Sequence, residues 1–209
     1  MITSIVSKST YYPISIDELK SHIRMKIGQT IEDDALNIFR NAAITYTEKY
    51  LNRKLSKQTV KYYLDDFPKC DWIELPFPPI RNIPSSGLVY TNSTNGSTTF
   101  SSTKWSQDII SEPGRLVLNY NDDWPTGITL ANNNPISIEY QCGYGSTKLG
   151  SVGSTNIDLP ADIKNAVLMI AGIWYENREE YVINEFGNNF VKVPVGAREL
   201  LYNYRIKTF

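Results

Sequence analysis

The sequence predicts an α+β protein: a small bundle of about four helices, built from the two chain ends, with an inserted antiparallel β-domain. Three observations lead to this prediction. Helix-capping signals and helical apolar spacing mark both ends of the chain. Short β-type runs, separated by Pro, Gly, Asn and Ser clusters, fill the middle. The length of 209 residues and the 41% hydrophobic content suit one compact domain or two closely joined lobes.

Residues 1–56 are predicted to form an N-terminal arm and two helices of the helical domain. In ISIDELKSHIRM, Ser15 is a good N-cap and Glu18 completes a capping box. The next segment, EDDALNIFRNAAITYTEKYLNRK, begins with acidic residues and ends with basic ones, as the helix dipole favours. Its apolar side chains recur on one face.

Residues 57–144 are predicted to be the inserted antiparallel β-domain, a small sheet or sandwich. Six runs have β-type composition and are bounded by turn residues. These are QTVKYYLDDF, DWIELP, SGLVYT, STKWSQDII, GRLVLNY and PISIEYQC. The Gly/Ser-rich residues 145–158 follow without any apolar period, which predicts a flexible loop.

Residues 159–209 are predicted to return to the helical domain, with one helix after Pro160, a short helix near 194–204 and a tail. The longer helix is apolar over more than half of its circumference, so it needs cover on more than one side. A neighbouring subunit would supply a second partner. The predicted subunit-interface or helix-packing residues are Ile170, Ile173, Trp174, Tyr175 and Arg178.

The sequence argues against an enzyme and predicts no catalytic, metal-binding or cofactor-binding residues. His22 is the only histidine, and we interpret it as structural rather than as the base of a triad. With two distant cysteines, Cys70 and Cys142, a zinc site is not expected. The carboxylate pairs that could support glycoside hydrolysis fit solvated turns or a solvated helix face better. They are Asp65 with Asp66, Asp122 with Asp123, and Glu176 with Glu179 or Glu180.

Aromatic side chains in the β-domain leave a second function open, a carbohydrate- or receptor-binding module. Tyr90, Trp105, Tyr120 and Trp124 could stack on sugar rings, although core and cross-strand packing is the commoner use of such residues. A glycan-binding site would require some of these rings to face solvent.

The composition also restricts partners and compartment. Basic and acidic residues are balanced, 21 against 22, which argues against a dedicated nucleic-acid binder. No run of about 18 apolar residues and no secretory signal are present, so no membrane partner is expected. Cys70 and Cys142 are expected to be reduced thiols of a cytoplasmic product, and their spacing leaves a disulfide open.

Taken in order, the segments resemble the head–tail connector proteins of tailed bacteriophages, also called adaptors or head completion proteins, in the version with a β-domain between the helices. The resemblance covers nearly the whole chain from Pro13. It is carried by ISIDELKSHIRM, EDDALNIFRNAAITYTEKYLNRKL, QTVKYYLDDFP, IELPFPPIRNI, EPGRLVLNYNDDWP, ISIEYQCGYG, LPADIKNAVLMIAGIWYENREE and VPVGARELLYNYRIKTF.

This resemblance implies a non-enzymatic virion protein, made in the bacterial cytoplasm, that forms a homo-oligomeric ring beneath the portal protein. Family members usually assemble as twelve copies, extend the channel through which double-stranded DNA passes, and form the platform for the next connector or tail-completion protein. The C-terminal segment commonly reaches the portal. The corresponding portal-docking residues here are Tyr202, Tyr204, Arg205, Lys207 and Phe209.

Overall fold

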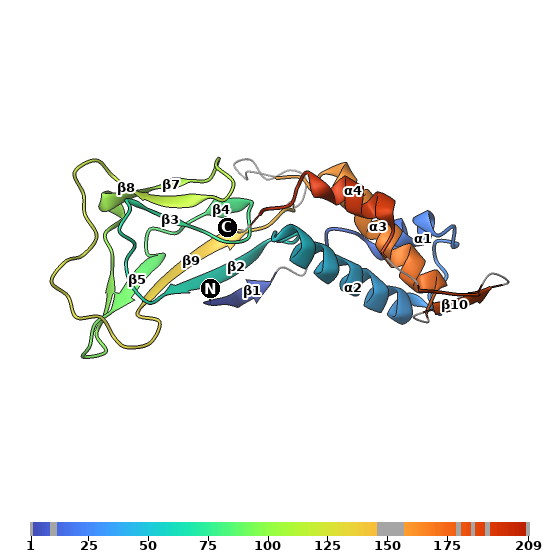
Figure 1. Cartoon of the computed structure of the whole chain (residues 1–209), viewed down its shortest axis with the longest axis horizontal. Coiled ribbons are helices and arrows are strands. Elements are labelled where there is room, and N and C mark those ends of the chain that lie inside the picture. The colour runs from blue at the N-terminus through green and yellow to red at the C-terminus, as the bar shows by residue number, and fades with distance from the viewer. Residues whose placement is uncertain are drawn as a thin grey trace. The chain divides into compact units, whose positions relative to one another are not determined.

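The computed structural model of the chain is drawn in Figure 1 and describes residues 2–8, 12–145, 157–178, 181–184, 187–190 and 193–207. The chain divides into two compact units. The β-unit comprises Met1–Tyr11 and Ser56–Ile157, and the helical unit comprises Tyr12–Leu55 and Asp158–Phe209. The predicted α+β fold class is confirmed.

The helical unit contains the helices that the sequence predicts. They are α1 (Ile16–His22), α2 (Asp33–Leu51), α3 (Ala161–Glu176) and α4 (Val195–Tyr202). The capping box is present: the Glu18 N–H donates to the Ser15 hydroxyl over 3.1 Å, and the Ser15 N–H donates to the Glu18 carboxylate over 2.8 Å. Helix α2 ends at Asn52, which adopts a left-handed conformation (φ 54°) that asparagine tolerates well.

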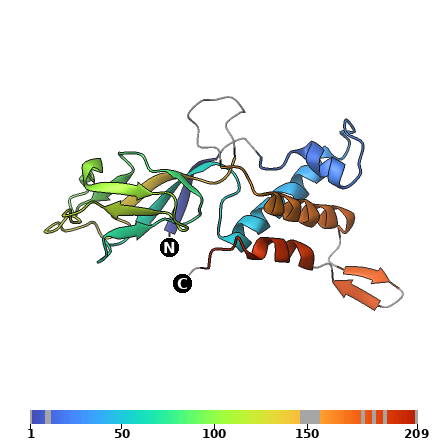
Figure 2. The ribbon, with the colours of Figure 1, turned by 90° about the horizontal axis from the view of Figure 1, so that it is seen from above.

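Helix α3 is the centre of this unit and packs against α1, α2 and α4. Figure 2 shows α3 between α1 and α4. Apolar side chains from every helix are fully buried around it, and they include Leu19, Leu36, Leu51, Ile163, Val167, Ile170 and Leu201. The second apolar side of α3 is therefore covered within its own chain, and its breadth does not by itself require a neighbouring subunit.

The β-unit contains two antiparallel sheets. The larger one has the order β1-β2-β9-β5-β6, with β4 also paired to β9. Its strands are β1 (Ile2–Lys8), β2 (Gln58–Leu64), β4 (Ile80–Asn82), β5 (Leu88–Thr91), β6 (Ser97–Thr99) and β9 (Ile136–Cys142). The smaller sheet has the order β3-β8-β7, formed by Trp72–Glu74, Arg115–Leu118 and Trp105–Asp108, with a 3₁₀ turn (η1, Ser102–Lys104) before β7.

One hydrophobic core joins the two sheets. Strand β9 alternates strictly, with Ile136, Ile138, Tyr140 and Cys142 buried, as a strand with one face on a core should. Leu116 from the smaller sheet is buried in the same core. The inserted β-domain is thus a small sandwich, and each of the six predicted β-type runs contributes a strand to it.

The N-terminal arm was predicted in the helical domain, and this part of the prediction is wrong. Ile2–Lys8 forms β1, an edge strand that pairs with β2 and belongs to the β-unit. Most of its side chains are exposed, so the segment carries none of the alternation by which strands are recognised. Strands β4 and β6 were missed because β4 lies in a Pro-rich stretch and β6 in a stretch of Asn, Ser, Thr and Gly, compositions that indicate turns.

A further hairpin, β10 (Tyr181–Asn184) with β11 (Gly187–Phe190), lies between α3 and α4 and was also not predicted. The predicted flexible loop lies largely outside the described residues, since 146–156 are not among them. Its two ends are joined by a hydrogen bond from the Gly145 N–H to the Ile157 carbonyl over 3.1 Å.

Candidate assembly surface

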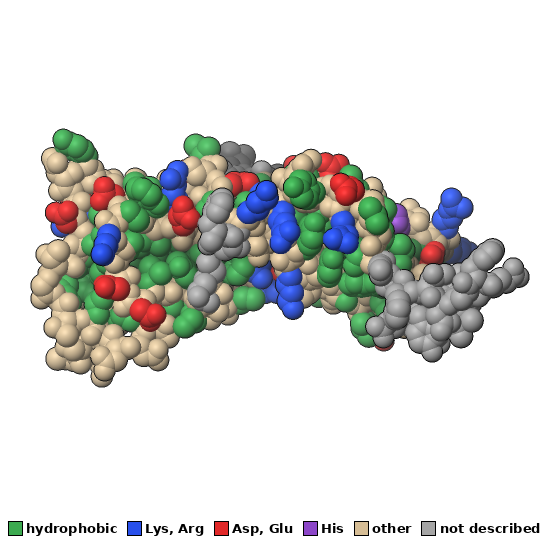
Figure 3. All heavy atoms as spheres, in the orientation of Figure 1, with side chains coloured by type: hydrophobic (Ala, Val, Ile, Leu, Met, Phe, Trp, Pro, Cys, Tyr) green, Lys and Arg blue, Asp and Glu red, His purple; other side chains and the backbone are tan. Residues whose placement is uncertain are grey.

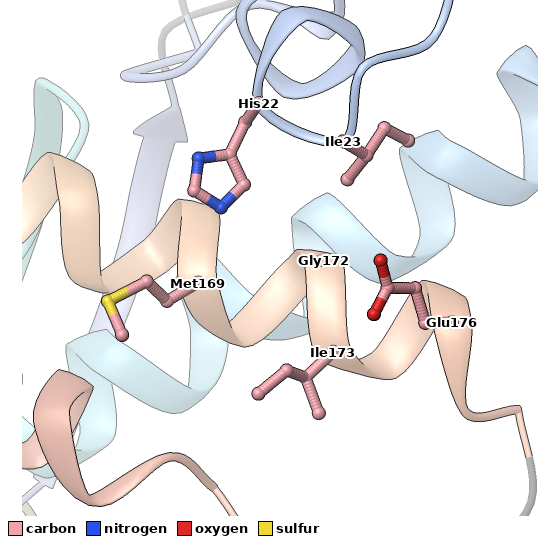
Figure 4. A pocket seen from close by; sticks show the side chains of 6 residues that line it. All are labelled: His22, Ile23, Met169, Gly172, Ile173 and Glu176. Atoms are coloured by element: carbon pink, nitrogen blue, oxygen red, sulfur yellow. The ribbon is translucent and has the colours of Figure 1, made fainter.

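The histidine that a catalytic triad would need lies at the end of α1, beside a small hollow over α3. This hollow of about 170 Å³ is lined by His22, Ile23, Met169, Gly172, Ile173 and Glu176. Figure 4 shows the imidazole directly above Gly172, where a Cβ would lie 3.5 Å from its Cδ2 atom. The six lining residues include no nucleophile beside a base, so the hollow has the features of a packing seam rather than an active site.

The carboxylate pairs are not arranged for acid–base chemistry. Asp65 and Asp66 are exposed in a turn, where Asp66 accepts the Phe67 N–H over 2.8 Å. Asp122 lies 3.8 Å from the Lys104 ammonium group, and Glu176 is exposed. Glu179 and Glu180 lie outside the described residues. Within the part of the chain that the structure describes, no three His, Cys, Asp or Glu side chains gather to hold a metal ion.

The β-unit aromatics are used mainly for packing. Trp105 is buried in the core, whereas Tyr120 is almost fully exposed. Trp124 donates its indole N–H to the Cys70 carbonyl over 2.8 Å and stacks on Phe67, with ring centroids 5.4 Å apart. A hollow of about 410 Å³ lies beside Trp124 and Tyr90. One face of Trp124 is thus already covered, which weakens the sugar-binding interpretation. Both cysteines are free thiols.

The α3 residues predicted as interface or packing residues contact α2. Ile170 is fully buried inside the unit, so its role is helix packing. Trp174 meets Tyr46 edge to face at 5.9 Å, and Tyr175 meets Phe39 in the same way at 6.2 Å. These rings are half-buried, as is Ile173.

Glu32, just before α2, links α2 to the end of α3. Its carboxylate accepts a hydrogen bond from the Tyr175 hydroxyl over 2.6 Å and from the Arg178 guanidinium over 2.9 Å. The Tyr175 hydrogen bond and the Arg178 charge lower the pKa of Glu32, and the same hydrogen bond raises the pKa of Tyr175. The Arg178 side chain is 57% exposed and lies just beyond the end of α3.

This carboxylate predicts a pH-dependent contribution to stability. The pKa of Glu32 lies below its ordinary value of 4.5, so its stabilisation is present above that value and is lost as the pH falls through the lowered pKa. We expect Glu32→Gln to lower the Tm by roughly 1–2 °C at neutral pH. In thermal melts the difference from wild type should shrink as the pH falls below 4.5 and through the lowered pKa of Glu32. Glu176→Gln, at an exposed acid that follows Tyr175 at the end of α3, is the control, and an equal pH dependence in both variants would contradict the assignment.

The segment after α4 is docked on its own unit. The Ile206 N–H donates to the Leu51 carbonyl over 3.0 Å, and the Asn52 amide donates to the Ile206 carbonyl over 2.9 Å. The Tyr204 carbonyl accepts from the buried Arg53 side chain over 2.6 Å, and its hydroxyl donates to Asp162 over 3.0 Å. Part of the predicted portal-docking segment, at Tyr204, is therefore held by contacts that the sequence pattern could not reveal.

Three described residues of this segment remain available to a partner. Tyr202, Arg205 and Lys207 are exposed, and the Arg205 guanidinium lies 5.2 Å from the centre of the Tyr50 ring. Phe209 lies outside the described residues. Figure 3 shows Lys and Arg side chains grouped over the C-terminal end of α2, where this segment docks.

The helical unit also exposes large apolar side chains, most of which the sequence did not single out. Among them are Ile27, Ile31 and Ile38, around the start of α2, and Val195 with Tyr202 on α4. Exposed apolar side chains that lie close together are candidates for protein contacts. None of the described helices is both long and apolar enough to span a bilayer.

Comparison with known proteins agrees with this picture. Residues 124–205, from the loop before β9 to the C-terminal segment, match the family model described as Phage gp6-like head-tail connector protein. The resemblance to head–tail connectors is confirmed. No curated protein is significantly similar to the connector-like chain in sequence.

Solved structures match the connector-like chain over its whole length. A chain in "Neck of empty GTA particle computed with C6 symmetry" has a TM-score of 0.74 and 19% identity, with 100% of this chain and 98% of that one covered. A chain in "Virion of native gene transfer agent (GTA) particle" has the same TM-score and 18% identity over the same shares. A chain in "Neck of native GTA particle computed with C12 symmetry" has a TM-score of 0.71 and 18% identity, again with 100% and 98% coverage. At these identities the likeness establishes the fold.

Proposed function

We propose that this protein is a structural head–tail connector in the neck of a phage-like virion. It forms a ring beneath the portal, continues the DNA channel, and provides the platform on which the next connector or tail component docks. The observation that carries the proposal is the likeness of the entire chain, both units included, to chains of a particle neck. The family match over the C-terminal helices supports the same role.

The proposed ring has twelve copies, and its subunits surround passing double-stranded DNA without holding it. Support for the number comes from the C12 symmetry of one neck whose chain has this fold. Support for transient passage comes from the net charge of −1, because affinity for duplex DNA depends on an excess of basic side chains that neutralise phosphates. The role is structural, and no catalytic step is part of it.

The decisive test is a mixture of this protein with purified portal protein of the same particle. Cryo-EM class averages should contain a ring of this chain, concentric with the portal and with cyclic symmetry. Native mass spectrometry should give a whole number of copies per portal. A chain that does not bind the portal, or that binds as scattered single copies, would contradict the proposal.

We also propose that portal docking depends on the end of the C-terminal segment. Deletion of residues 207–209 should weaken portal binding by about tenfold, which corresponds to roughly 1.4 kcal/mol. The measurement is biolayer interferometry on immobilised portal. Truncation before Tyr202 is a poorer test, because it also removes the hydrogen bonds of Tyr204 and Ile206 with α2 and its end.

The deletion after Ile206 keeps those hydrogen bonds, so its Tm should equal that of the full chain. Arg205→Ala, which removes the guanidinium beside Tyr50 but keeps the backbone, is the companion variant and should weaken binding in the same direction. If both variants bind the portal with wild-type affinity, the C-terminal segment is not part of the docking site.

A further inference from the structure

The first of two exposed apolar surfaces on the helical unit lies where α1 leads into α2. Ile27, Ile31 and Ile38 are 61%, 87% and 67% exposed. Arg24, Lys26 and Asp34 in the same stretch are also exposed, so this α1–α2 surface combines apolar side chains with two basic residues and one acidic residue. Three large isoleucines so close in sequence are more than the scattered apolar residues that any surface carries.

The second surface lies on α4. Val195 and Tyr202 are 71% and 59% exposed, and Glu199 between them is exposed as well. At 100° per residue these three side chains fall within roughly 60° of the helix circumference. Ala197 and Leu201 point the other way, into the core. The α4 surface is therefore a narrow apolar strip with Glu199 at its centre and the exposed Arg198 at its edge.

The two surfaces lie on opposite sides of the helical unit. Helix α3 packs against both α1 and α4, and Figure 2 shows it between them. A closed ring of more than two copies needs two different surfaces on each subunit, and the α1–α2 surface and the α4 surface form such a pair. Glu199 on the α4 surface and Arg24 and Lys26 on the α1–α2 surface offer opposite charges for a contact between them.

We propose that the α4 surface of one copy binds the α1–α2 surface of the next copy, head to tail. A contact between two different surfaces is heterologous, and it closes into a ring when the rotation between copies divides a full turn. This inference rests on the proposed ring and specifies which side chains join its subunits. Ile31 and Val195 form the apolar centre of the contact, and Glu199 pairs with the basic side chains of the α1–α2 connection.

This arrangement gives the C-terminal segment two separate tasks. Tyr202 belongs to α4 and contacts the neighbouring copy, whereas Arg205 and the residues after Ile206 are left for the portal. The buried Lys20 side chain supports the α1–α2 connection from within the same chain. Its ammonium donates to the Gln29 carbonyl over 2.7 Å and lies 2.5 Å from an oxygen of Asp33, which holds the connection in one shape.

Crosslinking of the portal-bound protein tests the inference. The variant Ile31→Cys/Val195→Cys is made in a Cys70→Ser background, since Cys70 is partly exposed while Cys142 is fully buried. After binding to purified portal, a short bis-maleimide should produce a ladder of covalent oligomers on denaturing gels. The single variants Ile31→Cys and Val195→Cys should give no ladder, because each places a thiol on only one side of the contact.

The outcomes separate this inference from the proposed function. A ring seen by cryo-EM without a ladder would overturn the head-to-tail contact and leave the connector role intact. Dimers from a single-cysteine variant would also overturn it, because they indicate a surface that binds its own copy. Absence of any ring on the portal in the wild-type protein would overturn the proposed function, and this inference with it.

A substitution adds a second, independent readout. Ile31→Asp should reduce ring formation on the portal at least tenfold, because it places a carboxylate in the apolar centre of the contact. Ile110→Asp, at a 92% exposed isoleucine of the β-unit, is the matched control and should assemble normally. Both side chains face solvent in the single chain, so the Tm of both variants should stay close to wild type. Equal assembly of the two variants would contradict the contact.

Discussion

Replacement of Gly143 by alanine is expected to destabilise the β-unit by about 3 kcal/mol or more. Gly143 has φ +96°, and a Cβ built there would lie 2.1 Å from the Ser56 carbonyl oxygen, a backbone atom that cannot turn aside. The position is held from both sides. The Gly143 N–H donates to the Pro79 carbonyl over 2.9 Å, and its own carbonyl accepts from the buried Arg81 over 3.1 Å.

The matched control for this substitution is Gly127→Ala. Gly127 also has a positive φ, +71°, but an added Cβ would meet no atom within 4 Å. The free energy of unfolding of Gly127→Ala should fall by only about 1 kcal/mol, the cost of placing a residue with a Cβ at a positive φ. The measurement is urea denaturation followed by tryptophan fluorescence, to which Trp72, Trp105 and Trp124 of the β-unit contribute. Similar losses in the two variants would show that the approach to Ser56 is not the cause.

Loss of the buried ammonium in Lys20→Met is expected to destabilise the helical unit by about 2 kcal/mol. The Lys20 side chain is 2% exposed, and its partner Asp33 is 27% exposed. In the variant, water can therefore solvate part of the Asp33 carboxylate that has lost its ion pair. The buried Asp33 oxygen meets Lys20 as an ion pair and lacks the alignment of a hydrogen bond. The Gln29 carbonyl loses its donor as well.

A double-mutant cycle with Asp33→Asn isolates the ion pair. The loss in Lys20→Met/Asp33→Asn should be smaller than the sum of the single losses by about 1 kcal/mol. Lys49→Met, at an exposed lysine of α2, should change stability by less than about 0.5 kcal/mol. Additive losses in urea denaturation would mean that Lys20 acts through packing alone. If the ion pair shapes the α1–α2 connection, Lys20→Met should also weaken ring formation on the portal.

These two sites were not visible in the sequence for different physical reasons. Gly143 stands in a Gly-rich stretch that resembles a linker, and only its approach to Ser56, far away in the chain, shows why glycine is required there. Lys20 is one of several charged residues on a short amphipathic helix. A lysine is expected in solvent, and its burial becomes clear only once the connection after α1 folds over it.

The ordering of the C-terminal segment shows the same limit. An aromatic and basic tail after a short helix predicts that the tail binds a protein surface. The residue pattern does not tell whether that surface belongs to the same chain or to a partner. In the structure the first partner is the end of α2, through Leu51, Asn52 and Arg53. Asn52 caps α2 in a left-handed conformation, and its side-chain amide donates to the Ile206 carbonyl.

The sequence by itself determined the elements whose signals are local. The Ser15–Glu18 capping box, the dipole-matched charges of α2, the helix after Pro160 and the alternation of β9 depend on neighbours within a few residues, so they could be recognised without a fold. The ordered set of such segments also carried the resemblance to head–tail connectors.

Only the tertiary structure decided where contacts join residues distant in sequence. It paired Ile2–Lys8 with β2, covered both apolar sides of α3 within one chain, joined Glu32 to Tyr175 and Arg178, and left Ile31 and Val195 exposed on opposite sides of α3. Burial and pairing across such separations depend on how whole elements pack. No periodicity within one segment records which of its side chains another segment will cover.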